Sequence, residues 1–454
     1  MRKYFGTDGI RRIANTELTP ELVYKVAKAG AYVLSKRTNR VPLILIGRDT
    51  RISGTLIESA MTAGFLSYGA NVKLLGVLPT PAVAYLTRKL NADASVVISA
   101  SHNTFEFNGI KFFSNKGMKI DDSIEEEIEE IIESDKIEEL TAANDKIGVS
   151  ELREELTSEY LEFFKDLFKN DLDSLNKNNF TVGIDTANGA TYKVAQKVFE
   201  MLGINHKIIN TNPDGININD KCGSTHLEAI KKLVVENHLD LGIAYDGDGD
   251  RCLAIDENGN EIDGDIFLAI VSNYMKEKGT LKNDTLVATV MSNLGLNKYC
   301  KENNLNIKQT KVGDRYVLEE MLKNGYNLGG EQSGHIIFLD YNPTGDGILS
   351  SLMLIKILLE KNKKASELKS IIKIYPQVLI NAKVSSNKKY DFDKDIEIKQ
   401  EIEKLEKEFS DNGRVLIRPS GTEPLVRVMI EGEDIEYIRK KAEKLVELIE
   451  EKLK

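Results

Sequence analysis

The stretch "PLILIGRDTRISG", from Pro42 to Gly54, sets a pattern that returns along the chain. The run LILIG predicts a buried strand, RDTRISG predicts a turn, and a helix is expected from Thr55. First strands of the same kind stand at 180–185 and 285–290. Each is followed by a helix, a second strand, another helix and a third strand. Three α/β units with largely parallel sheets are therefore predicted.

The last part of the chain departs from this pattern. The segments VLINAKVSS (378–386) and RVLIRP (414–419) predict strands, whereas the Lys/Glu-rich segments at 396–408 and near the C-terminus predict helices. The predicted fold class is α/β: three similar α/β domains with mixed, largely parallel sheets, plus a C-terminal α+β domain. The predicted domains are 1–155, 156–255, 256–368 and 369–454.

The composition of the chain disfavours several classes of protein. The 454-residue chain has a net charge of −10, which disfavours nonspecific nucleic-acid binding. Its apolar runs are too short to span a bilayer, and its first residues do not resemble a signal peptide. The widely spaced Cys222, Cys252 and Cys300 are typical of a reduced compartment, not of disulfides or a zinc site. A cytoplasmic protein is expected. The acidic run 121–139 predicts a solvated helix face, to which no function is assigned.

The third strand of each unit leads into a polar loop. These loops read SASHN (99–103), DGDGDR (246–251) and GGEQSGH (329–335). Ligands of α/β sheets bind beyond the carboxyl ends of strands. We therefore expect the three loops, each with its own chemistry, to converge on one cleft.

The loop DGDGDR predicts a metal site. Asp246, Asp248 and Asp250 alternate, so an extended backbone would place their carboxylates on one side. Three such groups repel one another unless a hard cation such as Mg²⁺, Ca²⁺ or Mn²⁺ lies among them. An EF-hand is disfavoured, because Arg251 stands where that loop requires glycine. An ordinary Asp-Gly turn is the alternative.

The loop SASHN brings a hydroxyl to the end of a strand. Ser101 is a candidate nucleophile or phosphate acceptor if a neighbour activates it or stabilises the phosphoryl group. In an extended loop the adjacent His102 faces away and is a poor proton acceptor for Ser101. Lys111 is a candidate charge or base. A capped turn is the alternative.

Two further loops are suited to a sugar phosphate. In GGEQSGH, alternation would place Glu331, Ser333 and His335 on one side, where they suit neighbouring hydroxyls. RPSGTEP (418–424) combines a guanidinium, hydroxyls and backbone N–H groups around a glycine, which is typical of a phosphate cradle. Its candidate residues are Arg418, Ser420, Gly421, Thr422 and Arg427. The sequence contains no GxxxxGK[ST] P-loop. Ordinary polar turns are the alternative for both loops.

Together with the start KYFGTDGIRR (3–12), these motifs resemble, in order and over nearly the whole chain, the α-D-phosphohexomutase family. GTDGIR, KVGDRYV (311–317) and GGEQSGH, with Gln332, are similar to the branch that acts on glucosamine phosphates. The alternative is the branch that acts on glucose and mannose phosphates.

The resemblance implies four domains around a central cleft and an isomerase that interconverts glucosamine 6-phosphate and glucosamine 1-phosphate. A hexosamine 1,6-bisphosphate would be the intermediate and activator. Such a reaction feeds UDP-N-acetylglucosamine and cell-envelope precursor synthesis. The implied partners are small sugar phosphates, with no nucleic acid and no membrane, and a homodimer is compatible with the family.

The resemblance also implies roles for residues. Ser101 would carry the phosphoryl group, and one Mg²⁺ per chain would be held by that group and by Asp246, Asp248 and Asp250. Lys111 would be the general acid or base, with Arg11 and His335 able to share the work. His102 and Arg251 would support the transferring group. The implied substrate-binding residues are Gly313, Asp314, Arg315, Glu331, Ser333, Arg418, Ser420, Gly421, Thr422 and Arg427.

Two positions depart from the family pattern. Thr104 follows SASHN where the family usually has proline, and Arg12 follows GIR where it often has glycine. Neither change removes a proposed ligand. Two rival functions use the same loops: a metal-dependent phosphatase that hydrolyses its own phosphoserine, and a sensor that binds sugar phosphates or Ca²⁺ without turnover.

Overall fold

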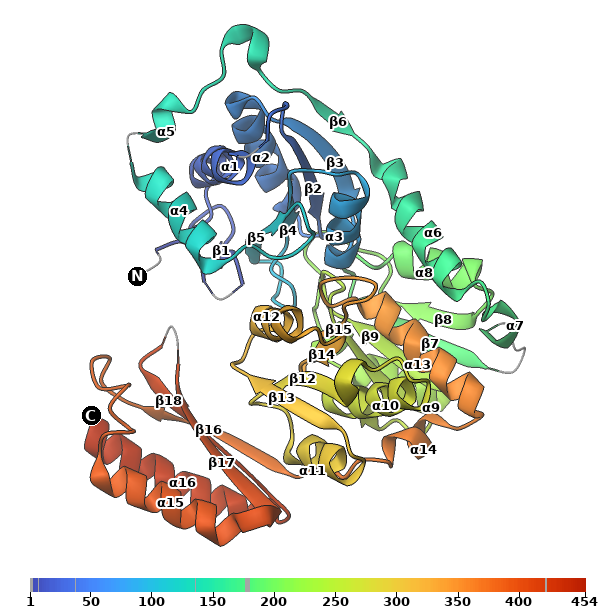
Figure 1. Cartoon of the computed structure of the whole chain (residues 1–454), viewed down its shortest axis with the longest axis vertical. Coiled ribbons are helices and arrows are strands. Elements are labelled where there is room, and N and C mark those ends of the chain that lie inside the picture. The colour runs from blue at the N-terminus through green and yellow to red at the C-terminus, as the bar shows by residue number, and fades with distance from the viewer. Residues whose placement is uncertain (1–2, 7, 37, 135, 176–179, 421–422) are drawn as a thin grey trace. The chain divides into compact units, whose positions relative to one another are not determined.

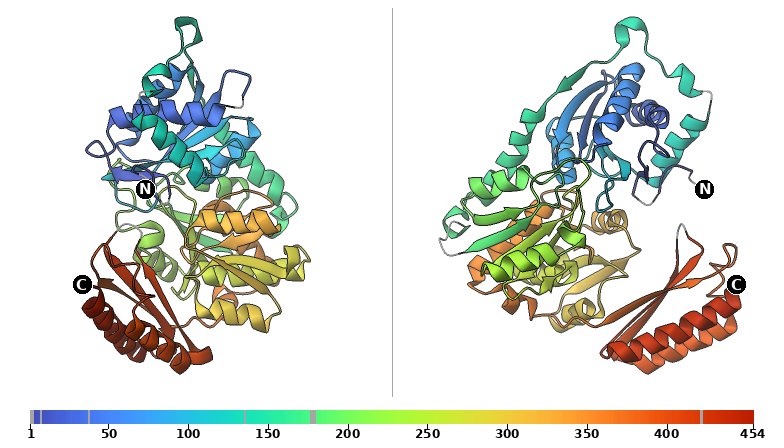
Figure 2. Two further views of the ribbon diagram at one scale, coloured as in Figure 1. Left: turned by 60° about the vertical axis from the view of Figure 1, so that its left-hand side comes forward. Right: turned by 180° about the vertical axis from the view of Figure 1, so that it is seen from behind.

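The computed structural model describes residues 3–6, 8–36, 38–134, 136–175, 180–420 and 423–454. The chain divides into two compact units. The core unit comprises Met1–Met291 and Leu305–Ile371, and the C-terminal unit comprises Ser292–Asn304 and Ile372–Lys454. Figures 1 and 2 show the sheets and helices within each unit.

The core unit begins with a six-stranded sheet of order β1-β5-β4-β2-β3-β6. Its strands are β1 (Ile10–Ile13), β2 (Leu43–Arg48), β3 (Asn71–Val77), β4 (Ala94–Ile98), β5 (Phe107–Ser114) and β6 (Ser150–Leu152). The accompanying helices are α1 (Pro20–Ser35), α2 (Gly54–Tyr68), α3 (Thr80–Lys89), α4 (Asp122–Glu133) and α5 (Lys136–Glu139).

The second sheet has the order β11-β10-β9-β7-β8. Its strands are β7 (Thr181–Asp185), β8 (Asn205–Ile209), β9 (Leu241–Tyr245), β10 (Cys252–Asp256) and β11 (Glu261–Ile262). Its helices are α6 (Thr157–Phe168), α7 (Leu172–Leu175), α8 (Val194–Met201) and α9 (Glu228–Glu236).

The third sheet has the order β13-β12-β14-β15. Its strands are β12 (Thr285–Thr289), β13 (Asn306–Thr310), β14 (Leu328–Gly330) and β15 (Ile336–Phe338), and its helices are α10 (Gly264–Glu277), α12 (Asp314–Asn324), α13 (Gly347–Lys361) and α14 (Ala365–Lys369). Short 3-10 turns span Asn144–Lys146, Glu154–Leu156, Gly223–Thr225, Lys282–Asp284 and Ser410–Asn412.

The three sheets share one topology. In each sheet, three strands of one α/β unit lie side by side in parallel, in the order second, first, third. These are β3-β2-β4, β8-β7-β9 and β13-β12-β14. An antiparallel strand, β5, β10 or β15, then returns beside the third strand. The predicted mixed, largely parallel sheets are confirmed. The return strand also makes each polar loop the connection of a β-hairpin.

The C-terminal unit is an antiparallel sheet of order β16-β18-β17 with helices on one face (Figures 1 and 2). Its elements are α11 (Leu294–Glu302), β16 (Gln377–Lys383), α15 (Ile396–Phe409), β17 (Gly413–Pro419), β18 (Leu425–Gly432) and α16 (Ile435–Leu453). Apolar residues of β16 and β18 pack against those of α15 and α16 to form its core. The predicted α+β character is confirmed.

Capping residues explain where several helices begin. The side chains of Thr19, Asp263 and Asp346 accept hydrogen bonds from backbone N–H groups in the first turns of α1, α10 and α13. Such bonds satisfy donors that a helix start leaves unpaired. Helix α2 ends at Gly69, whose φ of 101° is a left-handed conformation that glycine adopts without strain.

The acidic run has exposed residues, as expected for a solvated helix face, but part of it is buried. Glu129 on α4 is buried, and its carboxylate accepts hydrogen bonds from the backbone N–H groups of Lys3, Tyr4 and Phe5 at 2.6–2.7 Å. The run therefore has a structural role in holding the N-terminal segment. Among the described helices, none is both long and apolar enough to cross a membrane.

Candidate active site

Side chains from the three hairpin loops of the core unit meet. Ser101, after β4, donates a hydrogen bond from Oγ to Oδ2 of Asp246, after β9, at 2.6 Å. His335, at the start of β15, places Nδ1 3.5 Å from Oδ2 of Asp250. The predicted convergence of the three loops is confirmed by these contacts.

The three aspartates form a compact acidic cluster. Asp246, Asp248 and Asp250 each offer a carboxylate oxygen within 4.8 Å of the others, and all three are buried. Among the described residues, Oδ1 of Asp248 and Oδ1 of Asp250 have no hydrogen-bond partner. Burial, followed by the charges of Asp250 and Asp248, raises the pKa of Asp246 well above its ordinary value. Buried carboxylate oxygens without partners fit a hard divalent cation.

The backbone conformation that brings these carboxylates together differs from the predicted one. The loop after β9 is a turn, not an extended segment, and Gly249 within it has a φ of 72°. The prediction of an extended loop is also wrong at Ser101, whose φ of 51° is left-handed. As a result His102 does not face away, and its Nδ1 lies 3.4 Å from Oγ of Ser101.

His102 is held as a neutral group. Its Nδ1 lies 3.1 Å from Nη1 of Arg251, a permanent donor. Burial, then the charges of Arg251 and Arg11, lower the pKa of His102 to about 4. Arg251 also donates its backbone N–H to Asp246 at 3.2 Å, so it contacts both loops.

Two cations from the first sheet balance the carboxylates. Lys111 on β5 is 2% exposed, and its Nζ lies 3.0 Å from Asp248 and 3.1 Å from Asp8. Burial alone would lower the pKa of Lys111, but the charges of Asp248, Asp8 and Asp250 raise it well above its ordinary value. Arg11 on β1 pairs with Asp8 at 3.2 Å and donates to Oδ1 of Asn103. Lys111 is therefore protonated in this arrangement.

Sequence reasoning missed Asp8 and Lys119. Lys119 pairs with Asp8 and, at 2.7 Å, with Asp314 at the start of α12. These pairs connect the segment before β1 and the loop after β5 with the start of α12. Asp8 lies within the quoted GTDGIR stretch, but the position of Lys119 next to it depends on the fold.

The third hairpin is also a tight turn rather than an extended loop. Nε2 of His335 accepts a hydrogen bond from the backbone N–H of Gly345 at 2.9 Å, so both ring nitrogens have neighbours. Glu331 accepts one from the backbone N–H of Gly313 at 3.1 Å, and burial raises its pKa. The buried Oγ of Ser333 has no partner among the described residues, which leaves it able to bind a ligand.

Arg315 differs from the other predicted substrate-binding residues of this sheet. Its guanidinium makes two contacts with the Asp122 carboxylate, at 2.7 and 2.6 Å, and Asp122 begins α4. The geometry is that of a bidentate pair between α4 and α12. Arg315 therefore already has an anionic partner within the protein.

In the C-terminal unit, two predicted phosphate ligands are neighbours. Arg418 on β17 stands directly opposite Arg427 on β18. Burial, then the charge of Arg427, lower the pKa of Arg418, whose Nε has no hydrogen-bond partner among the described residues. Like charges opposite one another are unfavourable without an anion, and a carboxylate oxygen of Glu423 lies 3.7 Å from Arg427. Ser420 lies at the end of β17, and Gly421 and Thr422 fall outside the described residues.

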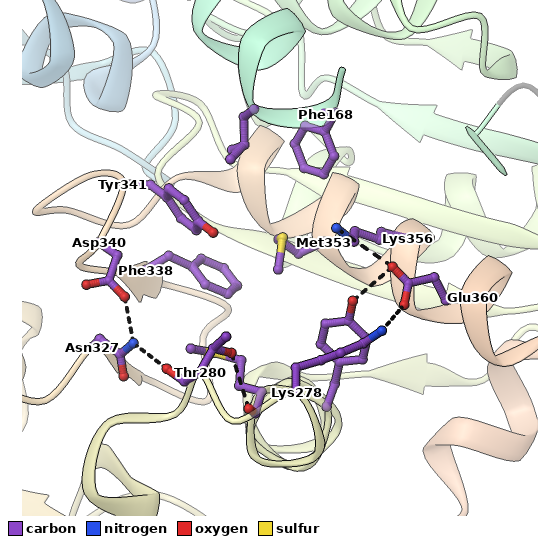
Figure 3. Close-up of a pocket in the computed structure, with 13 residues that line it drawn as sticks. Phe168, Lys278, Thr280, Asn327, Phe338, Asp340, Tyr341, Met353, Lys356 and Glu360 are labelled. Carbon is purple, nitrogen blue, oxygen red and sulfur yellow. Dashed lines mark hydrogen bonds and ion pairs between the residues drawn. The ribbon is translucent and has the colours of Figure 1, made fainter. Parts of the chain in front are cut away.

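A cavity of about 490 Å³ lies in another part of the core unit (Figure 3). Its walls mix apolar side chains, such as Phe168, Phe338 and Met353, with polar and charged ones. Its charged residues pair with other residues of the protein: Lys278 with Glu360 at 2.8 Å, and Lys356 with Asp171 at 2.9 Å. None of the predicted site residues lines this cavity.

Comparison with known proteins agrees with this geometry. Family models of phosphoglucomutase/phosphomannomutase match residues 2–139 (α/β/α domain I), 158–259 (domain II), 263–375 (domain III) and 379–448 (C-terminal domain). The chain therefore belongs to the phosphoglucomutase/phosphomannomutase family, and the family resemblance read from the motifs is confirmed. We refer to these matched regions as domains I to IV. The boundaries predicted from the sequence stay predictions.

Individual relatives carry a more specific name than the family models do. The chain is 55% identical to the phosphoglucosamine mutase of Acetivibrio thermocellus and 54% identical to that of Clostridium acetobutylicum, in each case over the whole of both chains. Among solved structures it resembles a phosphoglucomutase/phosphomannomutase family protein of Burkholderia thailandensis (TM-score 0.80, 20% identity, 98% and 97% of the two chains covered). It also resembles the N-acetylphosphoglucosamine mutase of Aspergillus fumigatus (TM-score 0.71, 17% identity, 99% and 96% covered). At these identities the two structures support the fold.

Proposed function

We propose that the protein interconverts glucosamine 6-phosphate and glucosamine 1-phosphate, with Ser101 as the phosphoryl carrier. The substrate is supported by relatives that are named phosphoglucosamine mutase and match the chain over its full length. The observation that carries the mechanism is the 2.6 Å contact between Oγ of Ser101 and Asp246 of the acidic cluster. It places the hydroxyl next to the strongest candidate cation site of the described residues.

In the proposed cycle, phosphorylated Ser101 gives its phosphoryl group to one hydroxyl of the sugar phosphate. The bond between Oγ and phosphorus breaks and Oγ takes up a proton from Lys111, while a bond forms between phosphorus and the sugar oxygen and the proton of that sugar hydroxyl passes to Lys111. The resulting hexosamine 1,6-bisphosphate turns around and returns its other phosphoryl group to Oγ of Ser101. Catalysis of such a transfer depends on in-line positioning and on neutralising charge.

The residues fit one Mg²⁺ per chain. Asp246, Asp248 and Asp250 would hold it together with a phosphoryl oxygen on Ser101, and the unpartnered buried oxygens of Asp248 and Asp250 support this assignment. When bound, Mg²⁺ neutralises charge on the transferring phosphoryl group.

Five nitrogen-bearing side chains of this site have proposed supporting roles. Lys111, which is protonated beside Asp248, is the proposed general acid, and it would act as the base after giving up that proton. Arg11 and Arg251 would stabilise phosphoryl oxygens. His102 is fixed by Arg251. His335 contacts Asp250, which supports a role in orienting that carboxylate more than in proton transfer.

Substrate recognition is divided among the remaining residues. Glu331 and Ser333 would bind sugar hydroxyls, with Gly313 and Asp314 beside them. In domain IV the opposed arginines, with Ser420, Gly421 and Thr422, would bind the phosphate that is not being transferred. Arg315 could join them only by giving up its pair with Asp122.

A coupled assay of both reaction directions tests the proposal. Glucosamine, glucose and mannose phosphates are offered in parallel, with free phosphate measured in each reaction. Preferred turnover of glucosamine phosphates supports it. Preference for glucose or mannose phosphates would assign the other branch, release of phosphate without isomerisation would indicate a phosphatase, and tight binding without turnover would indicate a sensor. A homodimer and a cytoplasmic location stay predictions.

A further inference from the structure

The backbone N–H and the carbonyl oxygen of Ser101 both form hydrogen bonds within the protein. Its N–H donates to Oγ of Ser99 at 2.9 Å, and Oγ of Ser99 donates in turn to Oδ2 of Asp49 at 2.6 Å. Its carbonyl oxygen accepts from Nη2 of Arg51 at 3.0 Å and from Nδ2 of Asn219 at 2.8 Å. These bonds hold a residue whose left-handed φ is uncommon for serine.

Arg51 binds the backbone of the Ser101 loop at several points. Its guanidinium donates to the carbonyls of Ser101, Asn103 and Phe107 at 2.8–3.1 Å, and also to that of Thr104. Its Nε pairs with Asp49 at 2.8 Å, and both side chains of that pair are fully buried. The rigid fork of donors in arginine allows one side chain to span carbonyls that a lysine ammonium could not. Arg51 thus fixes the turn at which the family usually has proline.

Asn219 repeats part of this arrangement from domain II. Its Nδ2 donates at 2.8 Å to each of two carbonyls, those of Ser101 and Asn103, and Arg51 binds the same two. Asn219 is 2% exposed and has a φ of 58°. The Ser101 loop is therefore held from both domains at once.

The metal loop passes directly beside these bonds. A Cβ added at Gly247 would lie 2.5 Å from the carbonyl oxygen of Ser101 and 2.8 Å from Nδ2 of Asn219. The turn that carries Arg51 also joins domain II, because the backbone N–H of Ile52 donates to the carbonyl of Gly215 at 2.8 Å. A shift of the Ser101 carbonyl would therefore displace Oγ relative to Asp246.

We propose that Arg51 and Asn219 form a two-domain clamp that positions Ser101 for phosphoryl transfer. The inference rests on the proposed role of Ser101 as phosphoryl carrier. Both are positioning residues, since they bind the backbone of the reacting residue and not the phosphoryl group. An in-line transfer tolerates little displacement, and misplacement by about 1 Å can cost on the order of 10²-fold in rate.

Asn219 can be replaced by glycine without backbone strain, because glycine tolerates its left-handed conformation. Asn219→Gly removes the donor and the side chain, whereas Asn219→Asp keeps the size but offers no donor to the two carbonyls. Both variants should lower kcat roughly 10- to 100-fold, with KM within about threefold of the wild type. Wild-type kcat in Asn219→Asp would show that shape alone matters and would overturn the clamp.

Asn210→Gly is the matched control. Asn210 lies in the same domain, also has a left-handed φ of 55°, and donates from Nδ2 to Asp185 at 2.9 Å, away from the Ser101 loop. Its loss should lower the melting temperature but leave kcat within about twofold of the wild type. Equal kcat losses in Asn219→Gly and this control would mean a general structural effect and would overturn the proposal. Arg51→Lys, if it folds, should be at least as impaired as Asn219→Gly.

Amide hydrogen exchange of residues 101–107 separates this inference from the proposed function, because it needs no substrate. Exchange should be faster in Asn219→Gly than in the wild type and unchanged in Asn210→Gly. Unchanged exchange in Asn219→Gly would overturn the clamp whatever the substrate. An inactive wild type would count against the proposed function, and the exchange result would still decide on the clamp.

Discussion

Ser101 and Asp246 are 145 positions apart in the chain, yet Oγ of Ser101 donates a hydrogen bond to Oδ2 of Asp246 at 2.6 Å. Both stand in the hairpin loop that follows the third strand of their sheets. A phosphoryl group on Oγ would bring about two negative charges to this carboxylate. The pair is therefore compatible with phosphorylation only when cations balance the site, and Lys111, Arg251 and a divalent ion would do so.

The first prediction concerns Ser101→Ala. This variant should lose turnover by roughly 10³-fold or more, since it lacks the phosphoryl acceptor, while it still binds substrate. The purified wild type should contain a population heavier by one phosphoryl group, located at Ser101 by peptide fragmentation. Ser99 is a poor alternative acceptor, because its hydroxyl links the backbone N–H of Ser101 to Asp49, which is not part of the acidic cluster. Wild-type turnover in Ser101→Ala would contradict the mechanism.

The second prediction concerns the metal. Asp248→Asn removes one carboxylate charge of the acidic cluster, so Mg²⁺ affinity should fall at least about 10- to 100-fold. Mg²⁺ titration of turnover after chelation measures this affinity. In the wild type, Ca²⁺ should restore less activity than Mg²⁺, because its larger, looser coordination misplaces the phosphoryl group. Full activity of the wild type in EDTA would contradict the assignment of the metal site.

The sequence allowed the repeated strands and the chemistry of the loops to be predicted, because both depend on local patterns. LILIG predicted β2 to within a residue at each end, since an apolar run bounded by polar turns is a local signal. DGDGDR predicted the acidic cluster, although the extended backbone assumed for it is a turn in the structure. The antiparallel return strands were missed, because the partner of a strand is set by tertiary pairing.

What could not be predicted from the sequence lies in buried polar contacts between distant segments. RDTRISG was interpreted only as a turn, although Arg51 binds the Ser101 loop about 50 residues further on. The left-handed backbone of Ser101 has no local signal, since serine rarely adopts it. The prediction that His102 faces away was wrong for this reason. The burial of Glu129 in the acidic run could not be predicted, because composition does not show which face of a helix packs against the protein.

The third prediction concerns the phosphate site of domain IV. Arg418→Ala removes a charge-assisted donor worth about 1.5–3 kcal/mol, so KM for the sugar phosphate should rise roughly 10- to 100-fold. More bisphosphate should escape during turnover, since remote binding energy also orients the intermediate. Arg439→Ala on the exposed face of α16 removes the same charge and should leave KM unchanged. Equal KM values for the two variants would mean that RPSGTEP is only a turn.

The fourth prediction concerns stability and pH. Tyr160 on α6 donates from its hydroxyl to Oδ2 of the buried Asp346 at 2.7 Å, and Asp346 caps α13. Tyr160→Phe keeps the ring but removes this donor to a carboxylate, at a cost of about 1–3 kcal/mol in unfolding free energy near neutral pH.

The sign of its pH dependence follows from Asp346. Burial raises the folded-state pKa of Asp346 above its ordinary value, and loss of the Tyr160 hydrogen bond, which lowers it, would raise it further. A folded pKa above the unfolded one means that folding takes up a proton as pH falls through the folded pKa, so low pH relieves the cost of the buried charge. The deficit of Tyr160→Phe should therefore be largest at neutral pH and shrink as the pH falls toward the ordinary range of aspartate. Urea unfolding of both proteins across this range measures it, and a deficit that grows with acidity would contradict the assignment of a charged Asp346 as the acceptor.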